Sequence, residues 1–295
     1  MATISYGKVQ TDTTLKGVEG WVYNRAEDAA IARMRAPYLY VDPADPYYSS
    51  VSLNNGSVHT GYDMLNSERW FWTKPDMEIN QANAAFNNLP TFDFIGDYNY
   101  TTSTGSTDLD FQVPMLPMCR SYTIVTMASV TASVLSQMNA TDGTSKYLFD
   151  GWDDIATEVV MSFQMLRSAG TRMWSFTPRA GVSGNGHSVS WTTYPGVVPV
   201  ADTPFIVAIQ FDYDTLTSKF YFNDGETPVS IKTDHSQAYD GADGRYWLGT
   251  VNMTNTTSGW IGSVGKFFVH DDTVTPMTTE MRTAMFNEWK AAAGI

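Results

Sequence analysis

Aromatic residues beside Asn or Asp are the side chains of this sequence with the clearest chemical use. An aromatic ring stacks on the apolar face of a sugar, and amide or carboxylate oxygens hold its hydroxyl groups. Such residues recur between positions 152 and 194. Each also fits packing in a core or a loop, so both interpretations stay open. The candidate glycan-binding residues are Trp152, Asp153, Asp154, Trp174, Asn185, Trp191 and Tyr194.

A metal ion is the alternative occupant of the first of these positions. Asp150, Asp153 and Asp154 surround Trp152 and offer the hard oxygen ligands that calcium prefers. The same cluster is also typical of a solvated turn. We therefore expect no cofactor, with calcium as the alternative.

Sequence motifs typical of catalytic sites are missing from the rest of the chain. The four histidines are too far apart for a helical metal site, and no Gly-x-Ser-x-Gly nucleophile elbow occurs. The run from Gly184 to His187 lacks the Lys of a phosphate-binding loop, so it predicts a turn.

Composition and charge exclude further classes. The net charge is −13 and no basic run occurs, which argues against nucleic-acid binding. The single cysteine, Cys119, excludes an internal disulfide framework and a cysteine-rich zinc site. No stretch is long and apolar enough for a membrane span, and the first residues do not resemble a signal peptide. We expect synthesis in a cytoplasm without export.

The elements that would position these residues are mostly strands. Val207, Ile209, Phe211 and Tyr213 alternate with polar residues, the period of a half-buried strand. A second strand follows over 219–222, and Asp224-Gly225 predicts a tight turn with positive φ. Two more strands are expected over 246–249 and 260–270. The pattern then changes, at Thr278, to a closing helix with an apolar stripe formed by Met281, Met285 and Trp289.

This order resembles the concanavalin A-like lectin/glucanase superfamily, and within it the laminin G-like (LamG) domains of phage structural proteins. The matching motifs are 211–214, 220–225, Leu248-Gly249 and the strand from Trp260 to Asp271, where Lys266 replaces the usual acid and His270 the usual Tyr. Strands over 89–98 and 122–127 match the start of the domain. The resemblance implies a mainly β fold over 89–295: an antiparallel β-sandwich, or jelly roll, with short helices and an N-terminal extension.

The catalytic members of this superfamily carry a Glu-x-Asp-x-x-Glu strand, in which the acids flank a glycosidic bond. None of the eight Glu residues here begins such a motif. The sequence therefore predicts that the protein is not an enzyme.

Residues 1–88 show weak periodicity and many aromatic side chains. The sequence predicts a short helix over 28–35, a turn at 54–56 and a second helix from Asp76 to Asn88. Aromatic residues are enriched in interface cores, so we expect this segment to anchor the protein in an assembly; the alternative is that it wraps its own sandwich. The candidate interface residues are Trp21, Tyr38, Tyr40, Tyr47, Tyr48, Trp70, Phe71 and Trp72.

Three functions compete. The favoured one is a non-enzymatic virion structural protein of a phage, a decoration, fibre or tail component whose sandwich could serve adhesion. Its expected partners are other virion proteins, copies of itself and host-surface glycans. The alternative is a free carbohydrate-binding lectin, for which an export signal or a clear calcium site would be expected. The third is a polysaccharide-cleaving enzyme, but the sequence lacks the Glu-x-Asp-x-x-Glu motif that would supply the catalytic acids.

Overall fold

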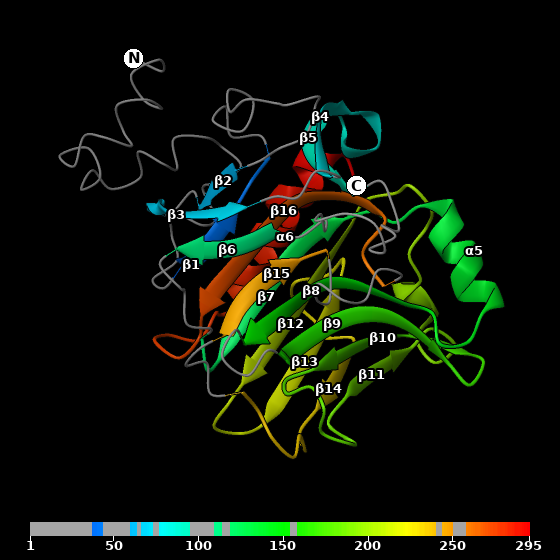
Figure 1. Ribbon diagram of the computed structural model, residues 1–295, viewed down its shortest axis with the longest axis vertical. Coiled ribbons are helices and arrows are strands. Elements are labelled where there is room, and N and C mark those ends of the chain that lie inside the picture. The colour runs from blue at the N-terminus through cyan, green and yellow to red at the C-terminus, as the bar shows by residue number, and fades with distance from the viewer. Residues whose placement is uncertain are drawn as a thin grey trace.

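The computed structural model describes residues 37–43, 60–63, 66–72, 77–94, 109–113, 119–153, 158–239, 244–249 and 258–295. Two antiparallel sheets pack face to face as a β-sandwich (Figure 1). The expected fold class is confirmed. No helix in these ranges is long and apolar enough to cross a membrane.

Sheet A has the order β14-β13-β12-β7-β16-β5-β4, with β1 also paired to β16. Its strands are β1 (Pro37–Val41), β4 (Met77–Asn83), β5 (Leu89–Phe94), β7 (Tyr122–Ala128), β12 (Phe205–Asp212), β13 (Thr217–Phe222), β14 (Ser230–Lys232) and β16 (Gly262–Asp271).

Sheet B has the order β11-β10-β9-β8-β15-β6-β3-β2. Its strands are β2 (Thr60–Asp63), β3 (Asn66–Trp72), β6 (Leu109–Val113), β8 (Ser145–Asp153), β9 (Glu158–Ser168), β10 (Thr171–Thr177), β11 (His187–Ser190) and β15 (Gly244–Leu248). Helix α5 (Ala132–Ala140) and the 3-10 turns η2 (Ala84–Phe86) and η3 (Pro195–Val197) connect strands.

Aromatic rings fill the space between the sheets. Phe149 stacks on Phe163 with ring centroids 4.9 Å apart, and Phe163 stacks on Trp174 at 5.3 Å. Sheet A contributes Phe211, Phe220, Phe222, Phe267 and Val269 to the same core, as the alternation of their strands predicts. The side chain of Trp247, expected in this core, lies outside the described residues.

Helix α6 (Thr279–Ala293) covers the outer face of sheet A. Its ends match the sequence signals, because Thr278 caps the N-terminus and Gly294 adopts φ 75° after the last turn. Met285 and Trp289 are fully buried, as their stripe predicts. Because α6 covers this face, β12 is buried on both sides instead of one: Ile206 and Ala208 pack beneath the helix.

The turn after β13 differs from its expected geometry. The positive φ falls at Asn223 (52°), whereas Gly225 is not among the positive-φ glycines. A Cβ at Gly225 would lie 2.8 Å from the carbonyl oxygen of Arg282. The glycine is therefore required by the close approach of α6.

Of the four described strands that precede residue 89, three pair with strands that follow it, and β2 pairs with β3. β1 pairs with β16 and β4 with β5 in sheet A, while β3 pairs with β6 in sheet B. The expected boundary between residues 88 and 89 thus separates paired strands of both sheets. The helix expected over 76–88 is wrong: residues 77–83 form β4, because pairing with β5 overrides a weak helical pattern. The helix over 28–35 and the turn at 54–56 lie outside the described residues.

A buried ion pair links the end of β1 to β16. Lys266 Nζ lies 3.0 Å from Asp42 Oδ2 and donates to the hydroxyl of Tyr40 at 3.1 Å. The two charged side chains are 2% and 1% exposed. The cation at position 266, unusual for the resembled family, therefore has its counter-ion in the N-terminal segment.

Candidate carbohydrate site

The side chains proposed as sugar ligands are mostly inside the protein. Trp174 is 0% exposed and donates from Nε1 to the carbonyl of Val197 at 2.9 Å, and Trp191 is 3% exposed. Neither presents a ring face to a ligand, because the two faces of the sandwich enclose them. Asn185 is fully buried as well, and Tyr194 is half-buried against the core. Burial therefore favours packing at Trp174, Trp191 and Asn185, and Tyr194 packs with part of its surface exposed.

For the remaining three candidates the structure describes at most the backbone. Trp152 and Asp153 lie in β8, where they pair with Arg245 and Gly244 of β15. Their side chains, and Asp154 altogether, lie outside the described residues. Groups of three or more His, Cys, Asp or Glu that could hold a metal are absent from the described residues.

Two of the candidate interface residues have described side chains, and both are at least partly buried. Tyr40 is fully buried beneath α6, so it has no surface to offer a partner, and Tyr38 packs partly buried against the core. Trp70, Phe71 and Trp72 lie in β3, with side chains outside the description. Trp21, Tyr47 and Tyr48 are outside it altogether.

An open pocket of about 390 Å³ lies on the outer face of sheet B. Strands β8, β9 and β10 form its floor. Along β9, Phe163 points into the core, so its neighbours Ser162 and Gln164 point outward into the pocket. A loop over residues 178–186 forms the wall. The lining residues are Tyr147, Ser162, Gln164, Thr177, Ala180, Gly181, Val182, Ser183 and Gly186.

The floor of this pocket is polar and neutral. Burial raises the pKa of Tyr147, and the charge of Asp150 raises it further, while contact with Gln164 opposes the shift. Tyr147 therefore remains a protonated hydroxyl and can donate. The Oε1 atom of Gln164 is buried, and none of the described groups donates a hydrogen bond to it. Buried polar atoms are normally paired, and this one lies beneath the surface that a ligand would touch.

Sequence reasoning missed Tyr147, Ser162 and Gln164. Their signal is present in the sequence: Met161, Phe163 and Met165 alternate with Ser162 and Gln164, which gives β9 one apolar and one polar face. The loop wall could not be inferred in this way, because its position depends on distant contacts.

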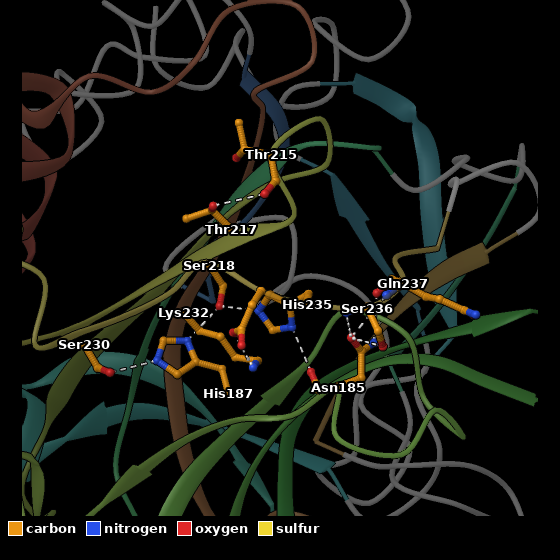
Figure 2. A network of polar contacts seen from close by, with 11 residues as sticks. Asn185, His187, Thr215, Thr217, Ser218, Ser230, Lys232, His235, Ser236 and Gln237 are labelled. Atoms are coloured by element: carbon orange, nitrogen blue, oxygen red, sulfur yellow. Dashed lines mark hydrogen bonds and ion pairs between the residues drawn. The ribbon is translucent and has the colours of Figure 1, made fainter.

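A polar network holds that loop in place (Figure 2). The side-chain amide of Asn185 donates to the carbonyls of Arg179 at 3.2 Å and Gln237 at 2.9 Å. Its Oδ1 accepts from the backbone N–H of Ser236 at 3.0 Å. A Cβ built on Gly186 would lie 3.8 Å from Ser175 Oγ and Thr177 Oγ1, so the end of the loop lies against β10.

Two buried histidines continue this network. His187 Nδ1 lies 2.7 Å from Ser218 Oγ, and Ser218 Oγ lies 2.7 Å from His235 Nε2. His187 Nε2 is 2.9 Å from Ser230 Oγ, and His235 Nδ1 is 2.8 Å from the carbonyl oxygen of Asn185. Burial lowers the pKa of His187 to about 4, with His235 and Lys232 adding to the effect. Ser218 is fully buried, so no substrate reaches it as a nucleophile.

A second open cleft, of about 460 Å³, lies where β12 turns into β13. Several of its polar groups are already engaged. The Arg120 guanidinium lies 4.2 Å from the centre of the Tyr213 ring, and Asp212 Oδ1 accepts from the amides of Asp214 and Thr215. Asp272 accepts from Thr123, Gln210 and the amide of Met277, and pairs with His270. We therefore place the candidate site in the pocket on sheet B.

Comparison with known proteins shows the fold alone. No family model and no curated protein matches the sequence. Among solved structures, a Trypanosoma rangeli sialidase in complex with sialic acid has a TM-score of 0.54 at 12% identity, covering 96% of this chain and 39% of that one. The binding domain of botulinum neurotoxin serotype D has a TM-score of 0.53 at 9% identity, covering 85% and 51%. This chain thus spans about half or less of either, and what it shares with them is a β-sandwich fold.

Proposed function

We propose that this protein is a non-catalytic carbohydrate-binding sandwich that serves adhesion as a structural component of a phage virion, and that its sugar binds in the pocket on sheet B. The observation that supports the sugar site is an open pocket with a polar floor beside the loop over residues 178–186. The floor offers hydroxyl and amide groups from Tyr147, Ser162, Gln164 and Thr177, the kinds of group that orient a sugar.

The lining residues also favour binding over cleavage. Hydrolysis of a glycosidic bond generally uses two carboxyl groups that flank it. None of the residues described as lining this pocket is Asp, Glu or His. Tyr147 is the titratable side chain among them, and its raised pKa keeps it neutral.

The same set of residues indicates the class of sugar. The sialidase of similar fold was solved with sialic acid, an anionic sugar. The pocket here has no Lys or Arg among its described lining residues, and the chain carries a net charge of −13. A neutral, hydroxyl-rich oligosaccharide fits these groups better than an anionic one.

Binding to a glycan array, followed by calorimetry with the best neutral oligosaccharide, tests the proposal. Tyr147→Phe removes one hydroxyl and should weaken binding by about 0.5–1.5 kcal/mol, a ~2- to ~10-fold rise in Kd. Gln164→Ala should weaken binding as well, and EDTA should leave it unchanged. Tyr213→Phe, the matched change in the second cleft, should bind like the wild type.

Other outcomes decide against parts of the proposal. No saturable binding to any array glycan would refute the sugar site, and loss of binding in the Tyr213 variant alone would move it to the cleft. The virion part is tested separately, by mass spectrometry of purified particles from the source of this sequence. Glycan binding by a chain that is absent from the particles would favour the free lectin.

A further inference from the structure

The loop over residues 178–186 ends on Asn185-Gly186, a pair whose chemistry allows the Asn side chain to lose its amide without an enzyme. Glycine has no side chain, so the backbone nitrogen of Gly186 can approach Cγ of Asn185. That nitrogen gives its proton to a solvent base as it bonds to Cγ, and Nδ2 takes a proton from water and leaves as ammonia. Water then opens the resulting succinimide ring to aspartate or isoaspartate. The net reaction exchanges ammonia for water and needs no other reactant.

The two reacting groups have different surroundings. Gly186 is exposed, and its backbone nitrogen forms no hydrogen bond with a described residue, so a solvent base can reach it. The Asn185 side chain is 0% exposed. Its amide group donates to two carbonyls while Oδ1 accepts from a backbone N–H, which holds Cγ in place. The reaction therefore proceeds from molecules in which the Asn185 side chain has left its hydrogen bonds, as happens in local opening.

Asn185 attaches one end of this loop to the segment over residues 235–239 (Figure 2). At the other end of the loop, the backbone N–H of Tyr239 donates to the carbonyl of Pro178 at 3.1 Å. Asn185 contacts residues 235, 236 and 237 through its carbonyl, Oδ1 and Nδ2 respectively. Loss of the Asn185 contacts would therefore leave the wall of the pocket attached at the Pro178 end.

Neither product of the reaction fits this position. An aspartate carboxylate has acceptor oxygens where the amide had two N–H donors. One oxygen can still accept from Ser236, but the other would face the carbonyl oxygens of Arg179 and Gln237. The carboxylate would also carry its charge into a fully buried position, which is costly. Isoaspartate routes the backbone through the side chain and so displaces Gly186 as well.

We propose that Asn185 is a deamidation site, and that its conversion to aspartate or isoaspartate permanently opens the wall of the pocket. The inference rests on the proposed function, since this wall belongs to the sugar pocket. A sugar that binds the closed wall lowers the population of the open state, so it should also slow the reaction.

The test follows the reaction in the full chain at mildly alkaline pH, both folded and unfolded in urea. Trypsin then releases the peptide over 180–219, in which Asn185 is the single Asn. Mass spectrometry should show its amide becoming an acid in both samples, more slowly in the folded one. With the best neutral oligosaccharide at about ten times its Kd, the folded rate should fall about 10-fold.

Three variants separate the reaction from its effect on the wall. Asn185→Asp supplies one product directly, so it should lose sugar affinity and show faster hydrogen exchange over residues 178–186. Asn139→Asp, the same change at an exposed Asn, should leave both unchanged. Gly186→Ala should slow the reaction in folded and unfolded protein alike, because its Cβ hinders the attack and lies an ordinary 3.8 Å from Ser175 and Thr177. A disturbed wall would instead speed the folded reaction.

The outcomes distinguish this inference from the function on which it rests. If no sugar binds, the proposed function fails, and hydrogen exchange in the Asn185→Asp protein alone decides whether the wall opens. An Asn185→Asp protein with wild-type exchange over the loop overturns the inference. So does a folded chain that keeps Asn185 intact while the unfolded chain reacts, or a bound sugar that leaves the folded rate unchanged.

Discussion

Replacing Lys266 by Met should strongly destabilise the protein, because it removes the ammonium group that lies 3.0 Å from the buried Asp42 carboxylate. Lys266 and Asp42 are 2% and 1% exposed, and their charged atoms lie 3.0 Å apart. Met keeps most of the aliphatic volume, so the change removes the charge and the ammonium hydrogen bonds rather than the packing. The perturbation therefore isolates the contact between β1 and β16.

The magnitude follows from the burial of both partners. Removing one member of a buried ion pair costs about 3–5 kcal/mol, because the remaining charge keeps its desolvation penalty. Replacing the pair with apolar residues is often close to neutral. The double change Asp42→Leu with Lys266→Met should therefore recover most of the loss.

Urea unfolding followed by tryptophan fluorescence measures this loss, with Trp289 as a nearby reporter whose ring lies 5.9 Å from Lys266 Nζ. Asp234→Asn breaks an exposed ion pair, in which the carboxylate side chain is 82% exposed, and should unfold close to the wild type. A Lys266→Met protein that unfolded at the wild-type urea concentration would refute the docking of β1 on β16.

Further predictions concern helix α6, the histidines and the N-terminal strands. Trp289→Ala should cost about 3–5 kcal/mol in the same assay, since the side chain is fully buried; a loss below that of an exposed substitution would contradict its role. The pKa of His187 is lowered from 6.5 to about 4, so the unfolded chain takes up a proton first and stability is lost as pH falls from 6.5 towards 4. Urea midpoints measured across this window should show a loss of at most ~3 kcal/mol, at about 1.4 kcal/mol per pH unit, and His187→Gln should flatten it. A chain that starts at residue 89 lacks β1 to β4 and the partner of Lys266, so circular dichroism should show a protein that melts well below the full chain.

The spacing of apolar residues along the sequence was enough to predict those strands, and the helix, whose buried face matches that spacing. Val207, Ile209 and Phe211 alternate and lie in the core of β12, and Thr278 and Gly294 mark the ends of α6. The burial of the other face of β12 was not predictable locally, because it depends on α6, which lies about 70 residues later in the sequence.

The site was harder to predict for the same reason. Trp174 and Trp191 have the residue type of a sugar platform, and only their place between the sheets shows that they are core residues. The pocket combines β8, β9, β10 and a loop, and that loop is fixed by Asn185 contacts with residue 237, 52 positions away. The hydrogen-bond partner of His235 is a backbone carbonyl that only the folded chain brings to it. The proposed anchoring role of residues 1–88 stays a prediction.

The position of β16 in sheet A has a consequence for how the chain folds. β16 pairs with both β1 and β5, and the Lys266–Asp42 contact joins residues 224 positions apart. Contacts between such distant residues form slowly, because the intervening chain must lose its freedom before they stabilise anything. During synthesis β1 and β5 must wait until β16 has emerged, with Phe92 and Leu39 still without their final neighbours. Completion of sheet A should therefore follow the synthesis of β16, and the segment from Gly262 to Asp271 should decide whether the earlier strands reach the native fold.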